Sequence, residues 1–233
     1  MKSHKAYIAF FDLDRTMISL NSGSTLVKMA RDKGLMTPLD IIKAIIQVIR
    51  YRLRLRKPKR IISDIGKWLK GMSVESFSVL AMDTVNKYLI GSIYPDVYRE
   101  IDLHKSNNAE LAILSSSIEQ ICKPIATHLG FDMTICTEME SNDGILTGLP
   151  SGAYCYGEEK RNRIITFCNT FNYDPASAYY YGDSISDLPA LDYVGNPVCV
   201  NPDKDLRRVA NLRGWRICDW KKYFKNKSVN IPV

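Results

Sequence analysis

The stretch AYIAFFDLDRT, residues 6–16, joins an apolar run to two closely spaced carboxylates. Its first six residues are apolar or aromatic, and a short run of this kind predicts a buried strand. Asp12 and Asp14 follow with one residue between them, a spacing that points both carboxylates to the same side of an extended backbone. Such a pair repels strongly unless a cation, a shared proton or several donors compensate, and Mg²⁺ would do so. A plainer structural explanation for an Asp after a strand is an Asx turn.

Polar side chains recur in three later segments. LAILSSS, residues 111–117, is an apolar run that ends in hydroxyls, and Lys160 opens the helical segment EEKRNRIITFCNTF. AYYYGDSISD, residues 178–187, is an aromatic run that leads to Asp183 and Asp187. In this order the four segments resemble the four motifs of the haloacid dehalogenase (HAD) superfamily of phosphohydrolases. The segments TEMESNDGILTG, GDSISDLPAL and VNPDKDL are most similar to its subfamily IB, the phosphoserine-phosphatase-like branch.

The resemblance implies a two-step phosphoryl transfer through an aspartyl phosphate. Asp12 would attack phosphorus, while Asp14 would protonate the leaving oxygen and later take a proton from water. The acid role requires a raised pKa of Asp14, which we expect from the neighbouring carboxylate and from burial. Mg²⁺ would lie between Asp12, the backbone carbonyl of Asp14 and Asp183.

The same resemblance implies the groups that hold the phosphate. Ser115 would donate its hydroxyl and Ser116 its amide to the phosphate oxygens, and Lys160 would offset the negative charge. Asp187 would support the site by holding metal-bound water or Lys160. Arg161 is the alternative to Lys160 if the register differs by one residue.

Apolar strand segments alternate with helical segments over much of the chain. This order is typical of a mostly parallel sheet with helices on both faces, so we expect a three-layer α/β/α, Rossmann-like fold. Active sites of such sheets lie beyond the carboxyl ends of the strands, where the four motifs fall. Residues 18–94 contain amphipathic runs with hardly any strand signal and predict a helical cap domain inserted after the first strand. The catalytic core would comprise residues 1–17 and 95–233.

The insert resembles a type 1 cap, which supplies substrate specificity in this branch. Asn21 stands nine residues after Asp12, where phosphoserine phosphatases carry a Glu that holds the substrate's amine. Asn21 is therefore the expected specificity residue, and strict phosphoserine specificity is not expected. Residues 21–24 also predict the start of a helix, Ser73 predicts an N-cap, and residues 139–149 predict a hairpin around Asn-Asp-Gly.

Composition limits the compartment and the partners. The 233 residues, 45% apolar and 24% charged, are typical of a soluble globular protein, and the net charge of +7 favours an anionic partner such as a phosphorylated metabolite. Six cysteines without a C-x-x-C pair indicate free thiols in a reducing cytosol rather than a zinc site or disulfides. The first apolar run is too short for a secretory signal, and Lys43 and Arg50 interrupt the most apolar region, so we expect a cytoplasmic protein.

Three functional hypotheses follow. The leading one is a Mg²⁺-dependent phosphatase, a phosphoric monoester hydrolase acting on a small phosphorylated substrate. The second applies the same chemistry to a lipid phosphate at a membrane surface, because an isoleucine-rich helix leads into the basic segment RYRLRLRKPKR, residues 50–60. A solvated helix end explains that segment more simply and is favoured. The third is a non-catalytic nucleic-acid or regulatory binding protein, but the basic segment lacks a recognisable motif and no nucleic acid is expected. The residues carry no signal for an oligomeric state.

Overall fold

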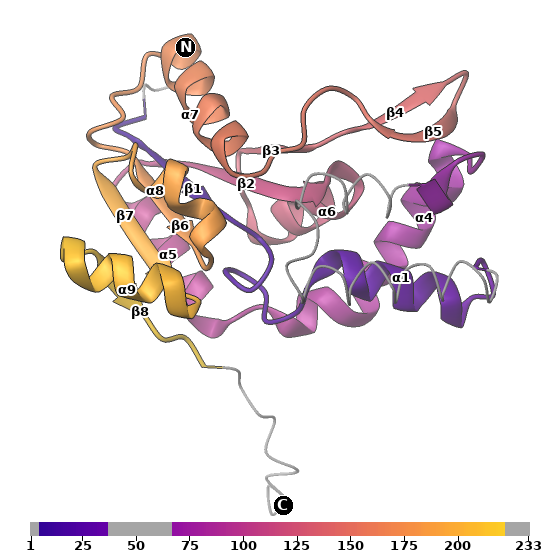
Figure 1. Cartoon of the computed structure of the whole chain (residues 1–233), viewed down its shortest axis with the longest axis horizontal. Helices are drawn as coiled ribbons and strands as arrows, with labels where there is room; N and C mark the ends of the chain where they lie inside the picture. Colours follow the sequence, from indigo (N-terminus) through magenta and orange to yellow (C-terminus); the bar gives the residue numbers. More distant parts are fainter. Residues whose placement is uncertain (1–4, 37–66, 222–233) are drawn as a thin grey trace, which may run out of the picture.

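The computed structural model describes residues 5–36 and 67–221, which form a six-stranded sheet whose neighbouring strands are all parallel (Figure 1). In spatial order the strands are β3 Met133–Thr137, β2 Glu110–Ile118, β1 Ile8–Phe11, β6 Tyr179–Gly182, β7 Asn196–Val200 and β8 Arg216–Cys218. The first strand in the sequence therefore lies inside the sheet, between β2 and β6. Its carboxyl end is flanked by those of two strands that come much later in the chain.

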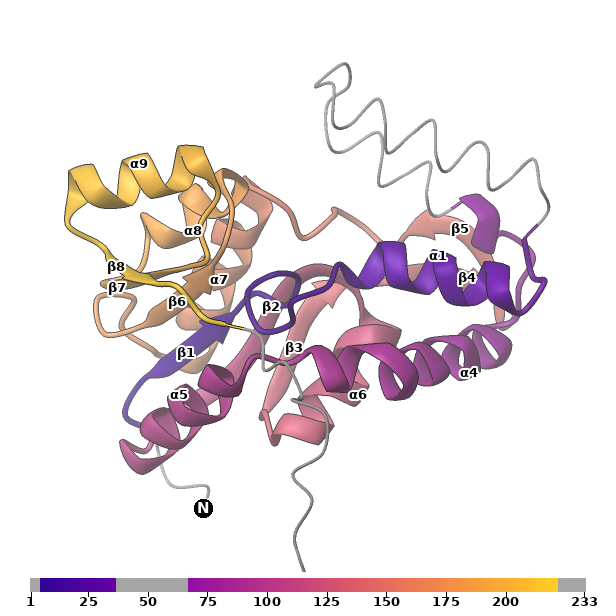
Figure 2. The ribbon, with the colours of Figure 1, turned by 90° about the horizontal axis from the view of Figure 1, so that it is seen from below.

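Helices cover both faces of this sheet (Figure 2). Side chains alternate along β1, so Ala9 and Phe11 lie in one apolar cluster while Ile8 and Phe10 lie in the other. The first cluster includes residues of α5 Pro95–Ser106 and α6 Glu119–Leu129; the second includes residues of α7 Glu158–Phe171, α8 Leu188–Leu191 and α9 Lys204–Arg213. The predicted three-layer α/β/α fold, Rossmann-like and mostly parallel, is confirmed.

The described chain between β1 and β2 is mostly helical. Its elements are α1 Ser22–Asp32, the 3₁₀ turn η1 Lys67–Leu69, α4 Val74–Thr84, the π-helical η2 Val85–Leu89 and the 3₁₀ turn η3 Ile90–Ser92. Asn21 and Ser73 cap α1 and α4 as predicted, each accepting a hydrogen bond from a backbone N–H. Leu26 of α1 and Phe77 of α4 lie in the same apolar cluster as Phe11, so these helices share a core with one face of the sheet.

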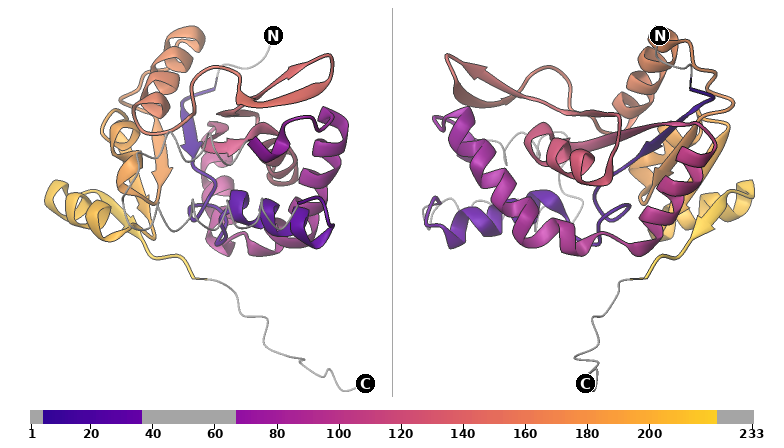
Figure 3. Two further views of the ribbon diagram at one scale, coloured as in Figure 1. Left: turned by 45° about the vertical axis from the view of Figure 1, so that its right-hand side comes forward. Right: turned by 180° about the vertical axis from the view of Figure 1, so that it is seen from behind.

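The predicted hairpin is present as β4 Met139–Asn142 and β5 Ile145–Pro150. Asp143 and Gly144 between the strands both have positive φ, at 47° and 76°, which suits a tight two-residue turn. The hairpin lies beside the start of α4 (Figure 3). Val74 N, at the first residue of α4, donates to Gly144 O at 2.8 Å, and Leu146 N donates to Met72 O at 2.9 Å. The hairpin is thus hydrogen-bonded to the chain between β1 and β2.

Two expectations concern residues outside the described ranges. The expected isoleucine-rich helix, which would start at Thr37-Pro38, and the basic segment of residues 50–60 both fall there. Within residues 5–36 and 67–221, no helix is long and apolar enough to cross a membrane.

Candidate active site

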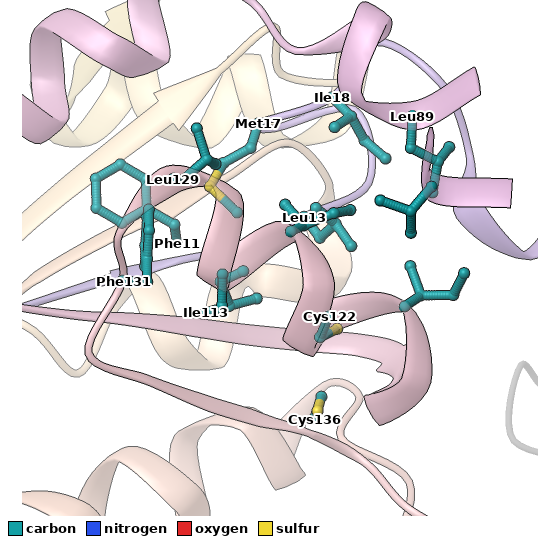
Figure 4. Packing of buried hydrophobic residues seen from close by; sticks show 14 of the residues in the cluster. Phe11, Leu13, Met17, Ile18, Leu89, Ile113, Cys122, Leu129, Phe131 and Cys136 are labelled. Atoms are coloured by element: carbon teal, nitrogen blue, oxygen red, sulfur yellow. The ribbon is translucent and has the colours of Figure 1, made fainter. Parts of the chain in front are cut away.

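Asp12 and Asp14 come after β1, which ends one residue before Asp12. Leu13, between them, is fully buried in the apolar cluster with Ile113 (Figure 4). The backbone N–H groups of Met17 and of the next residue both donate to Leu13 O, at 3.0 and 3.1 Å, so the chain turns sharply here. Since the strand has already ended, its alternation does not set the direction of Asp14. Asp12 lies at the carboxyl end of β1, whereas the Asp14 carboxylate contacts the start of α1.

Three buried carboxylates meet at the carboxyl ends of β1 and β6. Asp12, Asp183 and Asp187 each offer an oxygen, and these oxygens lie within 4.8 Å of one another. Asp183 follows β6 directly, and Asp187 ends the 3₁₀ turn η4 Ile185–Asp187. Asp12 N donates to Tyr181 O at 2.9 Å, which fixes the end of β1 against β6. The pairing of two parallel strands therefore brings together acids from distant parts of the sequence.

Lys160 lies among these acids, from the first turn of α7. It is 3% exposed, and its Nζ lies 3.0 Å from Asp12 Oδ1 and 2.6 Å from Asp187 Oδ1. Burial opposes the charged ammonium, but the two carboxylates outweigh burial and raise the pKa of Lys160 well above its ordinary value. The side chain is therefore a fixed positive charge within the acid cluster. Arg161, the alternative considered for this role, instead pairs with Glu158 at 3.6 Å.

Asp187 is held from several sides. Lys160 Nζ also donates to the Tyr180 hydroxyl at 2.9 Å, and that hydroxyl donates to Asp187 Oδ1 at 2.9 Å. Ser184 donates its backbone N–H and its hydroxyl to Asp187 Oδ2, at 3.2 and 3.3 Å. With donors on both oxygens, Asp187 is suited to positioning Lys160.

The cluster holds more negative than positive charge. Burial raises the pKa of Asp12 to about 6, with Lys160 opposing the shift and Asp187 and Asp14 adding to it. Burial also raises the pKa of Asp183 to about 9, and repulsion from Asp187 and Asp12 adds to that shift. One ammonium does not compensate three buried carboxylates, so the folded chain favours protonation or an additional cation here.

The donor set fits a hard divalent cation. Asp12 Oδ1 lies close to Lys160 but is buried without a hydrogen-bond partner among the described residues. Three buried carboxylates share the Lys160 ammonium, so this cluster has room in its charge balance for a further positive ligand. Carboxylate oxygens are the ligands that Mg²⁺ prefers in proteins.

Asp14 belongs to a second polar group at the start of α1. Ser22 donates its backbone N–H to Asp14 Oδ1 at 2.8 Å and its hydroxyl to Oδ2 at 3.0 Å. Asn21, the expected specificity residue, donates its amide to Oδ2 at 2.9 Å, while its own oxygen caps α1. Burial raises the pKa of Asp14 as expected, although the hydrogen bonds from Ser22 oppose the shift.

The two expected phosphate-binding serines lie at the end of β2. Ser115 is fully buried, and its hydroxyl accepts a hydrogen bond from Ser117 N at 3.3 Å. Ser116 is partly buried, and its carbonyl accepts a hydrogen bond from the Thr137 hydroxyl at 3.0 Å. Since β2 pairs with β1, both serines lie in the carboxyl-terminal part of the strand next to the one that leads to Asp12.

A cavity of about 170 Å³ opens beside Asp14. Asn21, Ser22, Ser116 and Ser117 surround its polar end, and Ser22 and Ser117 are joined by a 2.6 Å hydrogen bond between their hydroxyls. The other side chains that line the cavity are Leu26, Val27, Trp68, Leu69, Ile118, Ile121, Met139 and Tyr154. The cavity therefore lies between the inserted helices, the end of β2 and the hairpin.

Residues 9–192 match the family model of haloacid dehalogenase-like hydrolases, and this match includes all four acids, both serines and Lys160. The chain belongs to this family. The predictions of a phosphoserine-phosphatase-like member of the HAD superfamily, and of an enzyme that is a phosphatase, are confirmed.

Relatives of this HAD chain are similar over most of their length. The inhibition of morphological differentiation protein of Streptomyces azureus is 30% identical over 228 residues, covering 96% of this chain and 82% of that protein. A probable phosphatase of Mycobacterium tuberculosis is 30% identical, with 92% and 75% covered. Among solved structures, a phospho-aspartyl intermediate analogue of phosphoserine phosphatase has a TM-score of 0.69 at 15% identity, with 94% of this chain and 95% of that chain covered. That likeness shows the shared fold.

Three polar residues of this HAD site were not expected from the sequence. Tyr180 links Lys160 to Asp187, and the residue pair Ser22 and Ser117 links α1 to β2. A buried tyrosine hydroxyl needs a partner, which was a usable signal for Tyr180 in the strand before Asp183. No pattern in the sequence pairs Ser22 with Ser117, because they meet only through tertiary packing.

Proposed function

We propose that the chain hydrolyses a small phosphomonoester in a Mg²⁺-dependent reaction through an aspartyl phosphate on Asp12. The observation that carries the proposal is the buried cluster of Asp12, Asp183, Asp187 and Lys160 beside a cavity lined by Asp14. A buried excess of negative charge costs stability, and such clusters are concentrated at sites that perform chemistry.

Asp12 is the nucleophile in this proposal. Its carboxylate lies at the carboxyl end of β1, and in-line attack on phosphorus would replace one difficult hydrolysis by two easier transfers. Lys160, 3.0 Å away, holds the Asp12 carboxylate in place and offsets charge that develops on the phosphoryl oxygens. Ser115 and Ser116 would donate to the same oxygens from the end of β2.

Asp14 is the proposed general acid and base. It lines the cavity, and its raised pKa favours a proton that could pass to the leaving oxygen. The hydrogen bonds from Asn21 and Ser22 fix the orientation of the carboxylate. After the first transfer the same carboxylate would take a proton from the attacking water.

Asp12, Asp183 and the backbone carbonyl of Asp14 would hold the cation, with Asp187 orienting Lys160 beside them. When bound, Mg²⁺ supplies charge neutralisation and fixes the phosphate oxygens. Lys160 is already present in the cluster, so it limits the repulsion between Asp12 and Asp187 before any cation binds.

The direct test is a screen of phosphorylated metabolites with and without Mg²⁺. We expect metal-dependent release of phosphate from at least one ester by the parent chain and none by Asp12→Asn. Asp102→Asn on α5, an exposed carboxylate far along the sequence from the cluster, is the matched control and should retain full activity. Near-normal turnover by Asp12→Asn would refute the assignment of the nucleophile.

The domain division and the cytoplasmic location stay predictions. We propose that residues 18–94 act as a cap over a core of residues 1–17 and 95–233, since α1 and η1 line the cavity beside Asp14. The lipid-phosphate alternative rested on residues outside the described ranges. A non-catalytic binding protein is not retained, because the chain belongs to a family of hydrolases.

A further inference from the structure

The cavity beside Asp14 is lined by two chemically distinct groups of side chains. In the polar group, Asn21 and Ser22 each donate to the Asp14 carboxylate. The remainder of the wall consists mainly of aliphatic, aromatic and thioether side chains from α1, η1, the end of β2, α6 and β4. Binding sites for small molecules commonly combine such an apolar wall with a few placed polar groups.

The described part of the cavity wall carries no cation that could pair with the carboxylate of a zwitterion. Among the described residues that line the cavity, Asp14 is the only carboxylate, and none is Lys, Arg or His. The leaving alcohol of phosphoserine carries both an ammonium and a carboxylate. Moving these charges against Leu26, Val27 and Trp68 without partners would cost several kcal/mol on the scale of buried unpaired ions.

The cavity volume limits the size of the group that the described walls can enclose. A cavity of roughly 150 Å³ lined by aliphatic side chains accommodates benzene. The volume beside Asp14 is about 170 Å³, which is enough for one aromatic ring or a short branched chain but not for a diacyl lipid. An occupant of that size would have its ester oxygen next to the Asp14 carboxylate, where the proposed proton transfer takes place.

We propose that the substrate is a phosphomonoester of an uncharged alcohol whose apolar group, about the size of one aromatic ring, fills this cavity. The inference rests on the proposed function, because it identifies the cavity as the site of the leaving group. Val27, Trp68 and Met139 are then specificity-determining side chains. Apolar contact supplies the affinity, and the lack of Lys, Arg and His among the described lining residues disfavours amino-acid esters.

The test compares kcat/KM for benzyl phosphate, ethyl phosphate and phosphoserine with Mg²⁺ present. We expect benzyl phosphate to exceed phosphoserine by about 100-fold and ethyl phosphate by about 10-fold, since pocket contacts discriminate on this scale. A diacyl phosphatidate carried in phosphatidylcholine vesicles should be a poorer substrate than benzyl phosphate.

Variants locate the effect in the cavity. Val27→Asp should lower kcat/KM for benzyl phosphate by about 10-fold or more and lower that for ethyl phosphate by a smaller factor, because the larger apolar group makes more contact with the cavity wall. Val79→Asp on the exposed face of α4 is the matched control and should change neither. Met139→Gln, on β4 and partly buried, should act in the same direction as Val27→Asp with less risk to the fold of α1.

The outcomes separate this inference from the proposed function. Equal or faster turnover of phosphoserine, still dependent on Asp12, would overturn the inference and leave the proposed function intact. Phosphatidate hydrolysed better than benzyl phosphate would overturn the size limit and point to a lipid source for the apolar group. Failure of the parent chain to hydrolyse every ester with Mg²⁺ would overturn both.

Discussion

Replacing Asp183 by Asn should stabilise the cation-free protein while removing its response to Mg²⁺. The pKa of Asp183 is raised from 3.8 to about 9, mainly by burial and then by repulsion from Asp187 and Asp12. At a pH between these two values the folded chain keeps a proton that the unfolded chain releases. Each unit of pH above 3.8 therefore costs about 1.4 kcal/mol of stability until the folded pKa is reached.

The expected size follows from this difference. A pH of 7.5 lies 3.7 units above the ordinary pKa of 3.8, so the cost in stability at this pH is about 5 kcal/mol. The Asp183→Asn variant would remove it but bury an amide with incomplete hydrogen bonding, at about 1–3 kcal/mol. We expect a net gain of about 2–4 kcal/mol, which corresponds to an increase in Tm of roughly 5–15 °C for a chain of this length. At pH 5 the gain should fall close to zero, because the cost to the parent is then about as small as the cost of burying the amide.

The assay is thermal and urea unfolding at pH 5 and pH 7.5, in EDTA and in excess Mg²⁺. Mg²⁺ at about 100 times its Kd should stabilise the parent by about 2.7 kcal/mol and the variant by much less. Asp102→Asn, the exposed control on α5, should match the parent in all four conditions. An Asp183→Asn variant that is less stable than the parent in EDTA at pH 7.5, or that responds equally to Mg²⁺, would refute the electrostatic account.

Two further substitutions test how neighbours position the acids. Gly182→Ala would place a Cβ 2.9 Å from Asp187 Cβ, so we expect the free energy of unfolding in urea to fall by about 1–3 kcal/mol and kcat to fall as well. Gly91→Ala is the control, because no atom lies within 4 Å of its new Cβ, and it should lower neither quantity. A Gly182→Ala variant with unchanged stability and kcat would contradict the close packing. Asn21→Asp keeps the cap of α1 but puts a second carboxylate beside Asp14. Repulsion between the two carboxylates should raise the pKa of Asp14, so the high-pH limb of the kcat/KM profile should move to higher pH. A shift of that limb to lower pH would argue against Asp14 as the acid.

The sequence was sufficient for the fold and for much of the acid cluster. Apolar runs that end in polar residues mark parallel strands, and the resemblance to the HAD motifs implied that Asp12 and Asp183 meet; the structure places them at the ends of the paired strands β1 and β6. Lys160 was found through its place among the motifs, and the structure puts it between Asp12 and Asp187. Asp12 and Asp183 were predictable because each directly follows an apolar run that forms a strand.

The environment of Asp14 could not be obtained in the same way. Strand alternation predicts a shared side for Asp12 and Asp14, but β1 stops at Phe11 and a tight turn follows. Ser22 and Ser117 meet beside Asp14 only because α1 packs across the end of β2. The apolar cavity depends on the same packing, since its walls come from segments that share no periodicity in the sequence.

The most direct test of the central claim is to locate the transferred phosphoryl group. The parent chain, mixed with a hydrolysed ester and Mg²⁺ and quenched in acid during turnover, should yield a peptide phosphorylated on Asp12, and the same peptide from Asp12→Asn should be unmodified. Two results would contradict the account: a phosphoryl group on another residue, or an unmodified Asp12 in the parent chain during rapid turnover.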